Sequence, residues 1–132
     1  MDDELKQIEK FHGHLGPYAV IGYKMGEIAN EVLGSDSFSK KAVVWTSTKP
    51  PMSCIIDGIQ LSSGCTLGKG NIVVNSDGIP KASFSNNNGK KIDIILKSNI
   101  QNEIDTTVTE ENIVSYSELL YKKSTQELFE IL

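Results

Sequence analysis

The sequence contains no arginine, and all 13 of its basic residues are lysine. It therefore lacks the planar guanidinium group that reads guanine and holds phosphate through two parallel hydrogen bonds. Acidic residues number 17, which gives a formal net charge of −4 and an isoelectric point near 5.1. Because nucleic-acid-binding domains carry a basic surface, this charge balance argues against nucleic acid as a partner.

Long apolar runs and cysteine-rich patterns are also missing. No run approaches the ~20 apolar residues of a membrane helix. The opening segment, MDDELKQIEK, lacks the apolar core of a secretory signal. Two cysteines cannot form a disulfide framework, and in a cytosolic protein cysteines are more often free, metal-bound or reactive. We therefore expect a cytoplasmic protein that does not bind membranes.

The 132 residues suit one domain, which we place over residues 1–132. Helical spacing of apolar residues covers 3–33, with a break at Gly13–Gly16 and a restart at Pro17, because proline tolerates only the first turn of a helix. Gly34 follows as a C-terminal cap. The other expected elements are a strand over 41–48, a helix over 53–63, a strand over 71–75, a hairpin of strands 81–85 and 91–97, and a last helix within 110–132. This order, α-β-α-β-β-β-α, predicts an α+β domain with a mixed β-sheet flanked by helices.

Small residues form a stripe along the second half of the first helical region, at Ala19, Gly22, Gly26 and Ala29. Such a stripe allows another backbone to approach closely, and glycine within a helix otherwise costs about 1 kcal/mol. We expect the stripe to lie at the interface of a homodimer. The alternative is that it packs against the chain's own sheet.

The only two histidines lie in the segment FHGHLGP, residues 11–17. In a regular helix two residues at i and i+2 point roughly 200° apart, so His12 and His14 would not face one site. In a loop broken by glycine they can converge, and neutral imidazole is the commonest metal ligand. The alternative is that His12 is a surface or capping residue and His14 a buried, hydrogen-bonded one.

The only two cysteines lie in CIIDGIQLSSGCTLGKGN, residues 54–71. Cys54 falls in the first turn of the expected helix, where the helix dipole lowers a thiol pKa and favours a thiolate nucleophile or ligand. Asp57 follows at i+3 on the same face. A continuous helix would separate Cys54 from Cys65 by ~15 Å, too far for one ion to bind both. Either the helix is shorter, or Cys65 serves elsewhere, or a partner chain completes the site.

The end of this segment, GCTLGKGN, is similar to a phosphate-binding loop but does not match one. A Walker loop needs four residues between its first glycine and Gly-Lys, and then serine or threonine. Only three residues separate Gly64 from Gly68-Lys69, and Gly70 follows. The loop still exposes backbone that can bind an anion, with Lys69 as a point charge.

The segments FHGHLGPYAVIGYKMG (11–26) and CIIDGIQLSSGCTLGKGN (54–71) resemble the FmdE family, which takes its name from a component of formylmethanofuran dehydrogenase. With the order of elements, the resemblance covers most of residues 5–97. It implies an α+β core that is usually dimeric and often carries a divalent metal, typically zinc. Many members have cysteine where this chain has Gly16 and arginine where it has Lys24. No cysteine follows Cys65, so we expect the core domain without the family's C-terminal zinc finger.

Three functions follow from these features. The first is a zinc-binding accessory protein or enzyme of one-carbon or redox metabolism, linked through its family to methanogenesis. Its expected metal ligands are His14 and Cys54, then His12 and Cys65, and its catalytic candidates are Cys54, Asp57 and Lys69. The second is a non-catalytic dimeric module that docks on a larger molybdenum or tungsten oxidoreductase complex. The third is a thiol redox protein that uses Cys54 alone and reacts with alkylating agents well below pH 8.5.

Overall fold

The computed structural model describes residues 2–47 and 50–132. Two helices, α1 (Asp3–His12) and α2 (Pro17–Leu33), come first, and a short 3-10 turn, η1 (Met52–Cys54), leads into α3 (Ile55–Ser63). The strands are β1 (Lys40–Thr46), β2 (Ile72–Ser76), β3 (Lys81–Asn86), β4 (Lys91–Leu96) and β5 (Phe129–Ile131). The remaining helices are α4 (Ser98–Thr107), α5 (Ile113–Lys122) and α6 (Thr125–Leu128).

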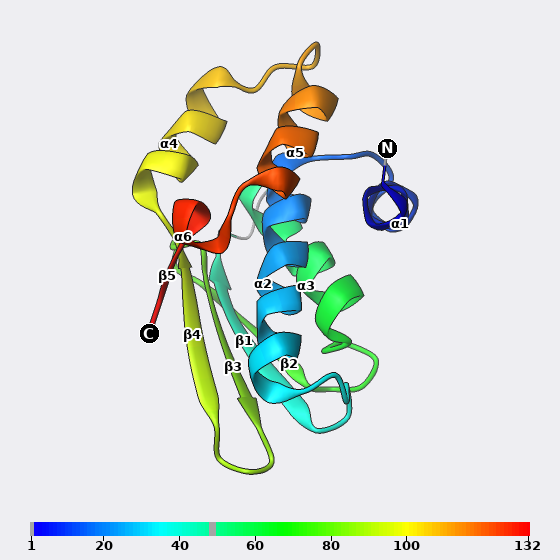
Figure 1. Cartoon of the computed structure of the whole chain (residues 1–132), viewed down its shortest axis with the longest axis vertical. Helices are drawn as coiled ribbons and strands as arrows, with labels where there is room; N and C mark the ends of the chain where they lie inside the picture. Colours follow the sequence, from blue (N-terminus) through cyan, green and yellow to red (C-terminus); the bar gives the residue numbers. More distant parts are fainter. Residues whose placement is uncertain (1, 48–49) are drawn as a thin grey trace.

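The strands form one five-stranded sheet in the order β2-β1-β3-β4-β5. β1 and β2 run parallel, and the other neighbours are antiparallel. Helix α2 lies along one face of this sheet with α3 beside it, while α4 and α5 lie near the end at which α2 begins (Figure 1). The predicted α+β fold with a mixed sheet flanked by helices is confirmed.

The break between the first two helices is also confirmed. Gly13 ends α1 with a φ of +102°, a backbone conformation that side chains disfavour, and α2 starts at Pro17. The predicted hairpin forms from β3 and β4, and Gly89 has the expected positive φ of +81°. The first predicted strand ends at Thr46; residue 48, its expected last residue, lies outside the described residues.

The prediction of one last helix within 110–132 is wrong, and α4 is absent from the predicted elements. Ser124 and Glu127 form a capping box that starts a new helix, α6, so α5 ends at Lys122. The three residues of β5 then pair with β4, where Glu130 lies opposite Ile95. A strand this short has no alternation that a sequence pattern can reveal.

The stripe of small residues packs within the chain. A Cβ added at Gly22 would lie 2.0 Å from the carbonyl oxygen of Ile55, and one at Gly58 would lie 2.0 Å from the carbonyl oxygen of Ala19. Both glycines therefore serve the crossing of α2 with α3. The expectation that the stripe forms a dimer interface is wrong, and so is the alternative that it faces the sheet.

No helix among residues 2–47 and 50–132 is long and apolar enough to cross a membrane.

Candidate functional site

The site begins with a hydrogen bond between two segments that are distant in the sequence. His12 is the last residue of α1, and Asp57 lies in the first turn of α3. The Nδ1 atom of His12 lies 2.6 Å from Oδ2 of Asp57. Because a carboxylate only accepts, the imidazole donates from Nδ1 and its Nε2 carries a lone pair. Only 11% of the His12 side chain is exposed, against 39% for Asp57.

His14 lies next to His12 in the glycine-flanked loop. The two ring centroids are 5.0 Å apart with the planes tilted by 37°, so the loop does bring the imidazoles together. A Cβ added at Gly16 would lie 3.2 Å from Nε2 of His14. The position where many FmdE-like chains carry cysteine therefore adjoins this same imidazole.

Cys54 closes the 3-10 turn that leads into α3 and is half-buried. Burial raises the pKa of its thiol, and the negative charge of Asp57 raises it further. This direction is opposite to the lowering that the helix N-terminus predicts. A raised pKa keeps the thiol protonated, so it gives no support to a thiol redox role for Cys54 alone.

Cys65 and Lys69 lie at the other end of α3. The helix runs without interruption from Ile55 to Ser63, about 14 Å at 1.5 Å per residue, which rules out the shorter helix. Cys65 is fully buried, and burial raises the pKa of its thiol although Lys40 and Lys69 oppose this. The structure thus gathers His12, His14, Cys54 and Asp57 and leaves Cys65 and Lys69 apart from them.

The segment around Lys69 has a different character. Its Nζ lies 5.4 Å from the ring centroid of Phe38, and both Phe38 and Leu67 are about four-fifths exposed, at 79% and 81%. The side-chain amide of Asn71 holds this surface together, because it donates to the carbonyl oxygens of Ser37 (2.8 Å) and Lys40 (3.0 Å).

Sequence reasoning missed this exposed pair, although one signal was present. Phe38 is the only aromatic residue in the polar stretch GSDSFSKK, residues 34–41. An aromatic residue in such a stretch has little apolar surface to pack against locally.

Within residues 2–47 and 50–132, no three His, Cys, Asp or Glu side chains are grouped closely enough to hold a metal ion. The four gathered residues are donors of the right chemical types, but they do not converge on one point in this arrangement.

Three comparisons place the chain among known proteins. A family model described as "FmdE, Molybdenum formylmethanofuran dehydrogenase operon" matches residues 11–130. A probable S-adenosyl-L-methionine-binding protein of Archaeoglobus fulgidus is 32% identical over 71 residues, which are 52% of this chain and 19% of that protein. The chain therefore spans about a fifth of that relative's length.

The fold has a counterpart among solved structures. The crystal structure of an FmdE-like protein of the tungsten formylmethanofuran dehydrogenase type, from Syntrophus aciditrophicus, superposes with a TM-score of 0.69. The match covers 97% of this chain and 68% of that one at 22% identity, a level at which the likeness concerns the fold.

Proposed function

Because this chain belongs to the FmdE family, we propose that His12, His14 and Cys54 bind a divalent metal ion, preferably zinc, with Asp57 orienting His12. The observation that carries the proposal is the 2.6 Å contact between His12 Nδ1 and Asp57 Oδ2. Metal-binding histidines commonly donate their second ring nitrogen to a carboxylate, which fixes the tautomer and the direction of the ligating nitrogen. Asp57 prepares Nε2 of His12 in this way.

The donor types suit zinc, since two imidazoles and a thiolate form a set that it commonly binds. The three side chains do not converge in the metal-free arrangement, so binding requires side-chain rotation. His14 is exposed on a loop between two glycines and Cys54 is half-buried, so packing leaves both room to turn. A bound cation would also reverse the electrostatic balance at Cys54 and favour its thiolate.

Such a site suits an accessory protein or an enzyme of one-carbon metabolism. Zinc held by three protein ligands keeps a fourth position for water or substrate and acts there as a Lewis acid. The fully buried Cys65 and the exposed Lys69 belong to the opposite end of α3 and take no part in this proposal.

Protein purified without a histidine tag should contain one zinc ion per chain by elemental analysis. The Cys54→Ala variant should lose it, and Cys65→Ala, the matched change at the far end of α3, should keep it. Zinc at a hundredfold excess over its Kd should raise the free energy of unfolding of the apo protein by about 2.7 kcal/mol. A metal-free protein whose stability ignores added zinc would contradict the proposal.

A second candidate function, docking on a larger molybdenum or tungsten oxidoreductase, is favoured by the exposed side chains of Phe38 and Leu67. Two large apolar residues held on tied loops are unusual unless another surface covers them. The lysine beside them adds a charge for an acidic rim on the partner. In this function the metal donors only shape the fold.

For this docking role, the tagged chain should co-purify with the oxidoreductase components from its native host. The double variant Phe38→Ser/Leu67→Ser should lose them. Leu119→Ser, at another exposed leucine, should retain them, since it leaves the Phe38–Leu67 surface intact. Retention by Cys54→Ala is expected of an adaptor, whereas its loss would tie docking to the donor site. The homodimer likewise remains a proposal, and light scattering measures it directly.

A further inference from the structure

A cleft of about 750 Å³ lies where β1 ends, between the start of α2 and the C-terminal helices. This volume is within the roughly 300–1,000 Å³ of small-molecule sites. Its walls are largely apolar and include Pro17, Met52, Ile104, Val108 and Ile113. Neither the two histidines nor Cys54 nor Asp57 lines it, so it is separate from the donor site.

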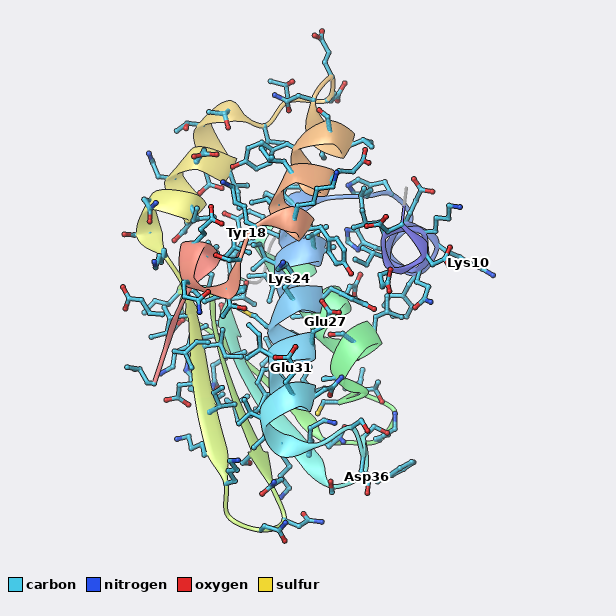
Figure 2. The ribbon with its side chains drawn as sticks, in the orientation of Figure 1. Lys10, Tyr18, Lys24, Glu27, Glu31 and Asp36 are labelled. Carbon is cyan, nitrogen blue, oxygen red and sulfur yellow. The ribbon has the colours of Figure 1, made fainter. Side chains whose placement is uncertain are left out.

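The polar groups of the cleft are few and of one charge sign. Asp105 and Glu110 are the only charged side chains among the described residues that line it. The hydroxyl of Tyr18 donates to Oδ1 of Asp105 over 2.6 Å, which joins the first turn of α2 to α4. Figure 2 shows Tyr18 at that end of α2, between this helix and the C-terminal helices.

The Tyr18–Asp105 bond gives the carboxylate a fixed direction. Tyr18 is buried, with 1% of its surface exposed, so its hydroxyl has little freedom to leave the carboxylate. Burial and the neighbouring carboxylate both raise the pKa of this hydroxyl, so it stays protonated as a donor. An apolar wall lowers the local dielectric, and this strengthens the field of both carboxylates inside the cleft.

We propose that this cleft binds a small organic cation with an apolar body, such as an alkylated or aromatic ammonium. The apolar walls would cover the body of the ligand, and Asp105 and Glu110 would face its charge. Anionic ligands are disfavoured, because the described lining offers them two carboxylates and no cation. The observations that carry this are the cleft itself, its charge sign and the oriented carboxylate.

The test is a nuclear magnetic resonance titration of the full chain with benzyltrimethylammonium, using benzyl alcohol and phenylacetate as neutral and anionic probes of similar body. The cation should shift the amides of Ile104 and Val108 and bind at least roughly tenfold more tightly than phenylacetate. Its affinity should fall as salt is added, because ions screen the carboxylates.

Asp105→Asn keeps the acceptor for Tyr18 and removes the charge, and Glu110→Gln removes the charge at the second position. Each should weaken binding of the cation several-fold. Glu31→Gln, on the exposed surface at the far end of α2, should not (Figure 2). No binding of the cation, equal binding of phenylacetate, or unchanged affinity in both cleft variants would overturn the proposal.

Discussion

Alanine at Gly22 or at Gly58 is expected to lower the free energy of unfolding by about 1–3 kcal/mol in each case. The reason is that the added methyl group meets backbone and cannot be accommodated by a side-chain rotation. The Cβ at Gly22 would lie 2.0 Å from the Ile55 carbonyl oxygen. At Gly58 it would lie 2.0 Å from the Ala19 carbonyl oxygen and 2.4 Å from the amide nitrogen of Tyr23. Either change forces α2 and α3 apart.

Urea denaturation of both single variants and of the double variant measures this effect. The two methyl groups obstruct the same helix crossing, so the double variant should lose less stability than the sum of the single losses. Gly68→Ala is the control, since its added Cβ would approach the Thr66 hydroxyl no closer than 4.0 Å and its φ is not positive. Single variants at Gly22 and Gly58 that stay within about 0.5 kcal/mol of the parent chain would contradict the argument.

This crossing also positions the donor site. Cys54 and Asp57 lie at the start of α3, and the histidine loop runs directly into α2. The glycines at the crossing thus fix the distance between the two sequence motifs. A separated crossing should weaken the contact between His12 and Asp57, so the glycine variants should also bind zinc less tightly.

The elements that the sequence predicts well are those with strong local signals. Pro17, Gly13 and Gly34 mark helix ends through backbone conformations that few other residues adopt, and Gly89 does the same for the hairpin. These signals act over two or three residues, so they do not depend on the rest of the fold.

The C-terminal third depends on tertiary contacts that the sequence alone does not display. Helix α4 buries only Ile100 and Ile104, two residues at i and i+4, and β5 exists because β4 offers it an edge. The capping box at Ser124 and Glu127 is the one readable signal there, and it divides the segment for which apolar spacing predicts a single helix.

The small-residue stripe shows a different limit. Its composition predicts a close helix contact, and the structure has one, but composition does not name the partner helix. Gly58, on α3, is the complementary residue that identifies it. A pair of glycine-bearing helices within one short chain was the available signal.

At the donor site, the sequence identifies residue types and leaves their orientation open. The hydrogen bond between His12 and Asp57 joins positions 45 residues apart, which no spacing rule connects. The direction of the Cys54 pKa also depends on three-dimensional surroundings. Burial and Asp57 raise it, whereas its place at a helix start suggests a lowering.

Asp57→Asn is expected to reduce zinc affinity by about 10–100-fold, the usual cost of losing a carboxylate that orients a metal-binding histidine. Asparagine keeps the size of the side chain but removes its charge, so it holds the His12 tautomer less firmly. Competition with a zinc chelator at fixed pH measures the change. Asp77→Asn, in the exposed turn before β3, is the matched control and should bind zinc like the parent chain.

The same variant should affect the metal-free thiol in the opposite sense. Asp57 is the second cause, after burial, of the raised pKa of Cys54, so removing its charge should lower that pKa. A lower pKa gives more thiolate, and iodoacetamide should alkylate apo Asp57→Asn faster than the apo parent chain at pH 8. A structural disturbance that merely buried the thiol further would slow alkylation instead. Weaker zinc binding together with faster alkylation therefore separates an electrostatic and orienting role of Asp57 from general damage to the fold.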